Sequence, residues 1–421
     1  MISRRRFLRD TTVVAGSAAL LRAPLYAEAS TTDPKLLEKA KTLLRQAPLI
    51  DTHNDLPSMI LEVAKGDLTK LDLAKEQPSV CADIPRLRQG CVGAQYWSIY
   101  VDAGTQRTHD AMHEALREFD VALRFIHDFH DLELATTADD IERANKAGRI
   151  ASLMGVEGGH MIENSTAALR VYYDLGARYM TLTHFDNIDW ADSATDRPLH
   201  YGLTDLGREI VHEMNRLGMF VDLSHVSADT MRDAIEISRA PVLFSHSNAY
   251  AICAHPRCVP DDVLRSLPKN GGVVHVNFIP SYIAPGAPQW AEKHKAALRD
   301  AHAHHDNDKA IADAMAVWIK ANPEPRGSIG DVADHIDHVR SVAGIDHIGI
   351  GADYDEVTPG AMVEGLDDCS RYPYLFAELL RRGYSDEDVL KIAGHNHLRA
   401  MRAMEQAAAS LKTETPAIIP R

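Results

Sequence analysis

The sequence predicts an α/β fold, a barrel of eight parallel strands surrounded by helices, known as a (β/α)₈ or TIM barrel. Three observations lead to this prediction. Short apolar segments alternate with helical segments along most of the chain, about eight apolar segments can be counted, and polar residues follow at least six of them. Alternating strands and helices form parallel sheets, and such barrels assemble their functional residues beyond the carboxyl ends of the strands. A doubly wound open sheet would instead concentrate its site at one switch point.

The predicted strands are short apolar segments, as expected for buried strands, and they are centred near residues 50, 95, 153, 180, 221, 243, 275 and 349. The segments between them carry apolar residues at helical spacing or capping residues at their start, which predicts helices. These helices span residues 33–46, 83–90, 109–131, 165–175, 204–217, 227–238, 261–267 and 328–342, and a last one begins at Ser385.

Length and composition describe an ordinary globular protein. The chain has 421 residues, of which 45% are hydrophobic and 25% charged, and its formal net charge is −15. Because phosphate binding needs a basic surface, this charge argues against a nucleic-acid partner. The cysteines form no CxxC motif; Cys81 with Cys91, or Cys253 with Cys258, could pair in an oxidising compartment, and small buried thiols are the alternative.

The first 29 residues predict a twin-arginine signal peptide. Arg4, Arg5 and Arg6 precede a mildly apolar run over 11–21, and Ala27-Glu28-Ala29 fits a cleavage site. That run is roughly half the length needed to span a bilayer, and no other stretch is apolar enough to do so. We therefore expect an exported protein, periplasmic or secreted, with no membrane span in the mature chain.

The mature chain is predicted to be a single barrel domain over residues 30–410. A polar, charged segment at about 283–325 breaks the alternation and is interpreted as an insertion over the barrel mouth or side. The tail, 411–421, is expected to be frayed.

Residues suited to metal binding or acid–base chemistry follow the predicted strands. They are His53, Asp55, Glu157, His184, His225, His246 and Asp353. Side chains two apart on a strand point to the same face, so the first two, an imidazole and a carboxylate, suit a divalent metal of the zinc type.

Each of these residues has an ordinary alternative. A single histidine after a strand is more often a hydrogen-bonded loop residue, Glu157 alone fits a surface carboxylate, and Asp353 alone fits a helix N-cap. Their shared position at strand ends argues for one site, which would fill two adjacent metal positions and leave a carboxylate for proton transfer. The other histidines considered lack that position and are interpreted as structural or surface residues: His160, His200, His255, His275, His395 and His397.

Several ordered motifs resemble the membrane (renal-type) dipeptidase family, which lies within the metal-dependent amidohydrolase superfamily. The resemblance runs from about residue 47 to about residue 405. Its motifs are Asp-Thr-His-Asn-Asp-Leu-Pro at 51–57, Glu-Gly-Gly-His at 157–160, Leu-Thr-His at 182–184, Asp-Leu-Ser-His-Val-Ser at 222–227, Phe-Ser-His-Ser at 244–247 and Gly-Ala-Asp-Tyr-Asp at 351–355.

The resemblance implies a (β/α)₈ barrel that holds two zinc ions per chain, and it implies a role for each matching residue. His53 and Asp55 would hold one zinc ion, Glu157 would bridge, and His225 with His246 would hold the other. His184 would contact the substrate and the oxygen of the tetrahedral intermediate, and Asp353 would transfer the proton. Arg257 would bind the C-terminal carboxylate of the substrate, a task suited to a planar guanidinium.

The implied activity is that of an exported zinc dipeptidase, a hydrolase. Its substrates would be dipeptides with a free C-terminal carboxylate, of L-L and also L-D configuration, cleaved by attack of a metal-bound hydroxide. Two alternatives remain: another amidohydrolase on the same frame (a lactonase or N-acyl amino acid deacylase), and a non-catalytic periplasmic binding protein. Glu157, in place of the modified lysine of many relatives, favours the dipeptidase, and Asp353 argues against a pure binding protein. A homodimer is a further hypothesis.

Overall fold

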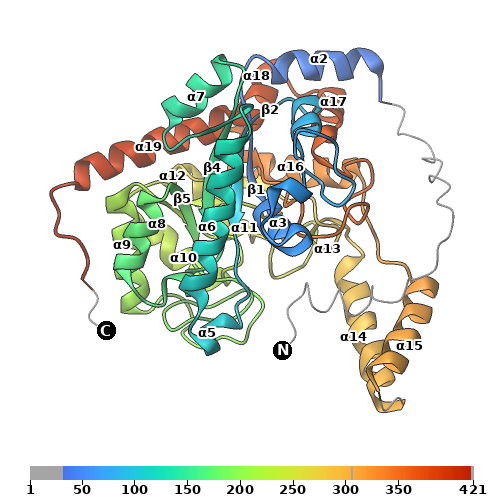
Figure 1. Cartoon of the computed structure of the whole chain (residues 1–421). Helices are drawn as coiled ribbons and strands as arrows, with labels where there is room; N and C mark the ends of the chain where they lie inside the picture. Colours follow the sequence, from blue (N-terminus) through green and yellow to red (C-terminus); the bar gives the residue numbers. More distant parts are fainter. Residues whose placement is uncertain (1–31, 305–306, 419–421) are drawn as a thin grey trace.

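Eight parallel strands close into a barrel in the computed structural model, which describes residues 32–304 and 307–418 (Figure 1). The barrel strands are β1 (Leu49–Asn54), β2 (Val92–Ile99), β4 (Ile150–Val156), β5 (Ala177–Thr181), β6 (Phe220–Asp222), β7 (Leu243–Phe244), β8 (Val273–Val276) and β9 (Ile348–Ile350). They are hydrogen-bonded in the order β2-β1-β9-β8-β7-β6-β5-β4, and a pairing of β2 with β4 closes the ring. The predicted fold class and all eight predicted strand positions are confirmed.

The strands are short, and every residue of these eight is buried. A strand covered on both faces reads as a continuous apolar run, which explains why these segments lack an alternating pattern. The closing pair has the longest register, from Ala94 opposite Ala151 to Ile99 opposite Val156. A short extra strand, β3 (Leu132–Leu134), adds to the start of β4 and was not predicted.

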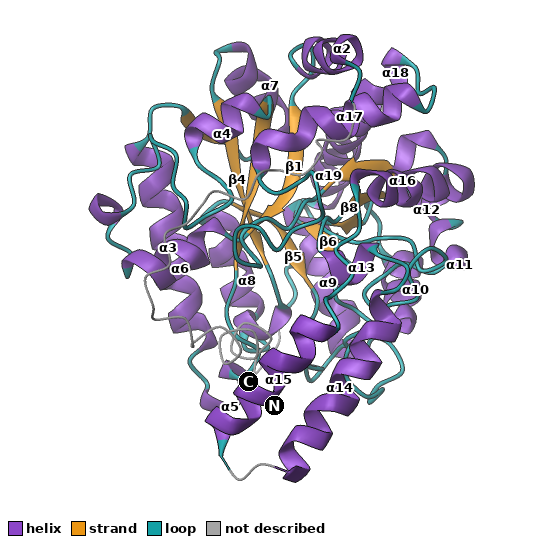
Figure 2. Ribbon diagram, turned by 90° about the vertical axis from the view of Figure 1, so that its right-hand side faces the viewer, coloured by secondary structure: helices purple, strands orange, loops and turns teal. Residues whose placement is uncertain are grey.

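Helices surround the strands on the outside (Figure 2). They are α2 (Pro34–Leu44), α3 (Leu56–Ala64), α4 (Ile84–Gln89), α5 (Thr105–Thr108), α6 (Ala111–Asp128), α7 (Ala138–Lys146), α8 (Thr166–Asp174), α9 (Asp205–Leu217), α10 (Ala228–Ile237), α11 (Asp261–Leu264), α12 (Leu267–Asn270), α13 (Pro280–Ile283), α14 (Ala287–His304), α15 (Asp308–Ala321), α16 (Ile329–Ala343), α17 (Tyr372–Arg381), α18 (Asp386–Leu390) and α19 (Asn396–Leu411). Local signals set several starts: the side chains of Asp33, Ser227 and Ser328 cap α2, α10 and α16.

The segment interpreted as an insertion contains α14 and α15. These two helices form a hairpin that projects away from the barrel (Figure 1). The ring of Trp290 stacks on His294 with centroids 4.9 Å apart, and Trp318 packs 5.6 Å from the same imidazole. This aromatic cluster holds the two helices together.

The end of the chain is more ordered than expected. The backbone N–H of Ala417 donates to Glu213 at 3.1 Å, and its carbonyl accepts from Thr166 at 3.0 Å and from Arg170 at 3.1 Å. The expectation of a tail frayed from Leu411 is therefore wrong as far as Ala417, because polar groups of α8 and α9 bind its backbone. The predicted signal peptide lies outside the described residues, and within them no helix is long and apolar enough to cross a membrane.

The close packing at position 155 in β4 requires a glycine, and this requirement can be tested. A Cβ at this position would overlap the ring of Tyr179 on β5, whereas one at Gly330 in α16 would have its nearest neighbour 3.4 Å away. We expect Gly155→Ala to lower the free energy of unfolding by roughly 1–3 kcal/mol, as overpacking does. Gly330→Ala, the control, should leave it unchanged or raise it by up to about 1 kcal/mol. Denaturant unfolding measures both, and equal stabilities would contradict this packing account.

Candidate metal centre

The seven strand-end residues meet in one buried site at the carboxyl end of the barrel. None of them is more than 4% exposed. Three overlapping groups of ligand atoms include all seven: His53, Glu157 and His246; Glu157, His184 and His225; and His53, Asp55 and Asp353. The structure therefore brings together every residue that the sequence placed at this site.

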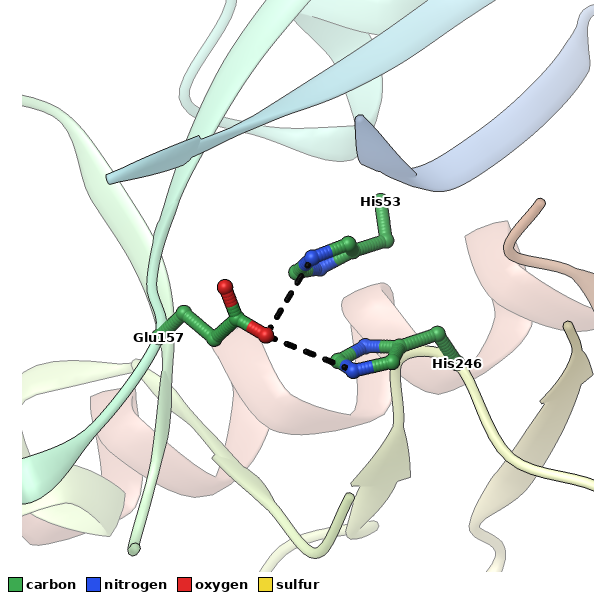
Figure 3. A group of neighbouring side chains, drawn as sticks. All are labelled: His53, Glu157 and His246. Carbon is green, nitrogen blue, oxygen red and sulfur yellow. Dashed lines mark ion pairs between the residues drawn. The ribbon is translucent and has the colours of Figure 1, made fainter. Parts of the chain in front are cut away.

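Glu157, directly after β4, is the shared centre of two of these groups. Its Oε1 lies 3.1 Å from Nε2 of His225 and 3.5 Å from Nε2 of His246. The Nε2 atoms of His53 and His184 lie 3.5 Å from the same oxygen. Figure 3 shows two of these imidazoles, from β1 and from the segment after β7, directed at this carboxylate.

The spacing at His53 fits a shared cation better than hydrogen bonds. Its Nε2 lies 3.8 Å from Oδ2 of Asp55 and 3.7 Å from Oδ1 of Asp353, too far for a hydrogen bond. This buried nitrogen has no hydrogen-bond partner among the described residues. Two ligands that each lie about 2.0–2.2 Å from a tetrahedral zinc ion are separated by roughly 3.3–3.6 Å. The donor set of imidazoles and carboxylates fits zinc as well.

The charges of the site also favour a cation. Burial disfavours a charged imidazole, but the carboxylates of Glu157, Asp55 and Asp353 raise the pKa of His53 to about 10. Burial raises the pKa of Asp353 to about 6, and His53 opposes this shift. The protein thus attracts a positive charge to this point, which is the property of a metal site.

Two of the imidazoles are oriented by hydrogen bonds to their Nδ1 atoms, on the side of the ring away from Glu157. The Nδ1 of His53 lies 2.8 Å from the hydroxyl of Tyr179, and the Nδ1 of His246 lies 2.8 Å from Oγ of Ser245. Because the outer nitrogen is engaged in each case, Nε2 faces the centre of the site, which is the usual arrangement of metal-binding histidines.

Backbone strain is concentrated at the same place. His225 and Asp353 have φ angles of 68° and 65°, in the left-handed region that non-glycine residues rarely adopt. Such conformations cost of the order of 1–3 kcal/mol each and cluster at functional sites. The surrounding barrel therefore holds both side chains in positions that the local sequence alone would not favour.

Arg257 lies beside the ligands. It is only 2% exposed, its Nη2 lies 3.4 Å from the carbonyl oxygen of His246, and its guanidinium carbon lies 5.3 Å from the centroid of the Tyr282 ring. Its Nε and Nη1 are buried and have no hydrogen-bond partner among the described residues. After burial, the charge of Arg257 is the next largest cause of the low pKa of His225. A buried guanidinium with two unused donors is suited to binding an anionic group.

The sequence also contained a residue of the site that the prediction missed. Asn277 follows β8 directly, and its Nδ2 donates to Oδ2 of Asp353 at 2.7 Å. The strand-end position was the available signal, but an amide is neither a titratable group nor a typical zinc ligand. Of the histidines set aside, His160 and His275 are buried and hydrogen-bond backbone carbonyls, which agrees with their structural interpretation.

Comparison with known proteins decides the family. A model of the family described as membrane dipeptidase (Peptidase family M19) matches residues 37–415. The chain belongs to this family. It is 39% identical over 393 residues to Dipeptidase 3 of Rattus norvegicus, covering 91% of this chain and 71% of the relative. It is 36% identical over 406 residues to Dipeptidase tcpJ of Claviceps purpurea, covering 94% and 86%.

Solved structures support the fold of this M19 dipeptidase. The probable dipeptidase PvdM from Pseudomonas aeruginosa superposes with a TM-score of 0.78 at 24% identity, over 89% of this chain and 99% of that one. The protein is therefore a metallo-dipeptidase, a hydrolase, and the resemblance drawn from the motifs is confirmed. The lactonase, deacylase and binding-protein alternatives are set aside.

Glu157 should matter more for metal binding than any other single ligand, because the Nε2 atoms of four imidazoles lie within 3.5 Å of its Oε1. We expect Glu157→Gln to reduce bound metal to less than one ion per chain, and Asp353→Asn to retain more than Glu157→Gln does. The measurement is elemental analysis after dialysis against buffered zinc. The metal-loaded wild type should also unfold at higher temperature than the chelator-treated protein, since a ligand at 100 times its Kd stabilises by about 2.7 kcal/mol. Full metal content in Glu157→Gln would contradict this assignment.

Proposed function

We propose that this dipeptidase uses two zinc ions to hydrolyse dipeptides that carry a free C-terminal carboxylate, of both L-L and L-D configuration. The observation that carries the substrate assignment is Arg257, whose buried guanidinium keeps two donors unused beside the ligand cluster. A buried cation is costly unless it is paired, and the carboxylate of a bound dipeptide would pair it in the bidentate geometry that arginine favours.

The five ligands divide into two sides around Glu157. In this proposal His53 and Asp55 would hold one zinc ion, His225 and His246 would hold the other, and Glu157 would contribute to both. The Nε2 atoms of His225 and His246 lie 2.9 Å apart, and Oε1 of Glu157 lies 3.1 Å from the first of these and 3.5 Å from Nε2 of His53, which supports this division. Zinc bound in this way polarises a carbonyl and makes a water acidic enough to act near neutral pH.

Asp353 is proposed to move the proton. Its Oδ2 accepts from Asn277 at 2.7 Å, and its Oδ1 faces the ligands, 3.7 Å from Nε2 of His53. This arrangement leaves one carboxylate oxygen to take the proton of the attacking water and pass it to the leaving amine. Burial, which raises the pKa of Asp353 to about 6, suits a group that must both accept and release a proton.

His184 is proposed to contact the scissile carbonyl oxygen. Its ring packs between two aromatic rings, 4.9 Å from that of Tyr100 and 4.1 Å from that of Phe185. The Nε2 lies 3.5 Å from Oε1 of Glu157, so it borders the metal positions. An imidazole held by packing in this way can donate to an oxygen that gains negative charge.

A relative supports including L-D dipeptides. A metallo peptidase from Rhodobacter sphaeroides, solved with a phosphinate mimic of the dipeptide L-Ala-D-Ala, superposes with a TM-score of 0.68 at 22% identity over 85% of this chain and 99% of that one. The proposed setting is outside the cytoplasm, reached by the twin-arginine pathway; its support is the sequence of residues 1–29 alone.

The direct test is hydrolysis of a panel of dipeptides by the purified, zinc-loaded protein. We expect cleavage of L-L and L-D pairs with a free carboxylate, and little cleavage of N-acyl amino acids or lactones. If the protein cleaves neither L-L nor L-D dipeptides, the proposal is wrong. Cleavage of L-L pairs alone would remove its stereochemical part.

Arg257 should determine the need for a free carboxylate. We expect Arg257→Met to raise KM for dipeptides by roughly 10- to 100-fold, since hydrogen bonds to charged groups are worth about 1.5–3 kcal/mol. Arg257→Lys keeps the charge without the planar fork and should fall in between. Dipeptide amides, which lack the carboxylate, provide the comparison: their poor turnover should change little. An equal loss for acids and amides would show that Arg257 does not bind the carboxylate.

Asp353→Asn should slow turnover, because an amide cannot take the proton from water. We expect kcat to fall by about 10²- to 10⁴-fold, the usual contribution of a general acid–base group. Metal content must be measured in the same preparation, since Oδ1 of Asp353 lies near His53. A variant that keeps its metal and its activity would contradict the proposed role.

A further inference from the structure

Asp222, the last residue of β6, is a fully buried carboxylate that belongs to none of the ligand groups. It nevertheless accepts four hydrogen bonds. Its Oδ1 accepts from the backbone N–H groups of Ser245 at 2.8 Å and Ser224 at 3.2 Å. Its Oδ2 accepts from the hydroxyls of Thr181 at 2.5 Å and Ser245 at 2.6 Å. These donors come from β5 and from the segments after β6 and β7, so the carboxylate ties three neighbouring strand ends together.

Ser245 connects this carboxylate to a proposed metal ligand. Its Oγ lies 2.6 Å from Oδ2 of Asp222 and 2.8 Å from Nδ1 of His246. A hydroxyl has one proton to donate, and a carboxylate can only accept. Ser245 therefore donates to Asp222 and accepts from the Nδ1–H of His246. The other nearby acceptor, Oγ of Ser224, is 3.4 Å away, and the shorter charge-assisted bond is the stronger one.

The direction of this chain fixes the tautomer of the imidazole. With its proton on Nδ1, His246 presents a lone pair on Nε2, the atom that lies 3.5 Å from Oε1 of Glu157. The other two imidazoles among the proposed ligands, those of His53 and His225, lack this control. The hydroxyl of Tyr179 can donate to or accept from His53, and Nδ1 of His225 has no hydrogen-bond partner among the described residues.

The backbone of Ser245 is held in place by contacts from other strands of the barrel. The hydroxyl of Thr52 in β1 donates to the carbonyl oxygen of Ser245 at 2.6 Å. That carbonyl also occupies the space that a Cβ at Gly351 would need. These contacts fix the backbone position from which the Ser245 hydroxyl reaches both Asp222 and His246.

We propose that Asp222, acting through Ser245, is a positioning residue that keeps His246 in the tautomer able to bind metal. This inference rests on the proposed function only in taking His246 as a ligand. It concerns how the protein prepares that ligand, and it assigns Asp222 no contact with substrate or metal.

Asp222→Asn reverses the hydrogen-bond chain with little change in shape. The two backbone N–H groups require an acceptor, so the amide oxygen stays on their side and Nδ2 faces Ser245 and Thr181. Ser245 must then accept from Nδ2 and donate to Nδ1 of His246, which moves the imidazole proton to Nε2. We expect one of the two metal ions to bind about 10- to 100-fold more weakly, the usual effect of losing an outer partner of a ligand. Cobalt and zinc titrations against a competing chelator measure this, and cobalt absorption reports the altered coordination.

The double variant Asp222→Asn/Ser245→Ala separates tautomer control from simple support. Without the hydroxyl, nothing donates to Nδ1 of His246, so its proton can return there and metal affinity should recover in part relative to Asp222→Asn alone. A merely structural role predicts that the double variant binds metal no better than the single one. Thr181→Val is the matched control, because it removes another donor to Asp222 without touching the chain to His246; its metal affinity should stay within about threefold of wild type.

Two results would overturn the inference: wild-type affinity for both ions in Asp222→Asn, or no recovery in the double variant. If Asp222→Asn does not fold, Ser245→Ala alone decides, and undiminished metal affinity there would also overturn it. All these readouts are made without substrate. A wild-type protein that binds two ions and shows the predicted variant behaviour, yet cleaves no dipeptide, would refute the proposed function and leave this inference standing. A wild-type protein that binds fewer than two ions would refute the inference itself.

Discussion

The convergence of four imidazoles on Oε1 of Glu157 is the constraint on which the rest of the structure depends. Four imidazole Nε2 atoms lie within 3.5 Å of this one oxygen, in a place from which water is largely excluded. Burying unpaired charge is strongly unfavourable unless opposite charge compensates it. Although burial disfavours a charged imidazole, the carboxylates of Glu157, Asp55 and Asp353 raise the pKa of His53, so this site favours positive charge. The barrel brings these groups together, because the four imidazoles and Glu157 lie at the carboxyl ends of five different strands.

The site also has energetic costs, which are backbone strain and hydrogen-bond donors without partners among the described residues. The left-handed backbone at His225 and Asp353 and the incompletely paired guanidinium of Arg257 each reduce the stability of the free protein. All three lie at the metal centre or beside it. In the proposed function, the metal ions and the carboxylate of the substrate would bind at these same groups and so offset part of these costs.

Much of this could be predicted from the sequence, because the signals were local. His53 and Glu157 each follow an apolar run, and in a parallel barrel all such positions meet at one end. What the sequence could not indicate depends on partners distant along the chain. Tyr179 lies in the middle of β5, and only the closed barrel shows that it supports His53. Asp222 begins the Asp-Leu-Ser-His-Val-Ser motif at 222–227, yet its hydrogen bonds to Ser245 depend on the pairing of β6 with β7. The docking of Ala417 likewise depends on side chains more than 200 residues away.

The central claim is that two metal ions lie on either side of Glu157. Anomalous diffraction from crystals of the purified protein, measured on both sides of the zinc absorption edge, tests it most directly. We expect two peaks roughly 3.5–4 Å apart, as in other two-metal sites. One should lie near His53 and Asp55, the other near His225 and His246, with Glu157 between them. A single peak, or peaks away from these residues, would contradict the account.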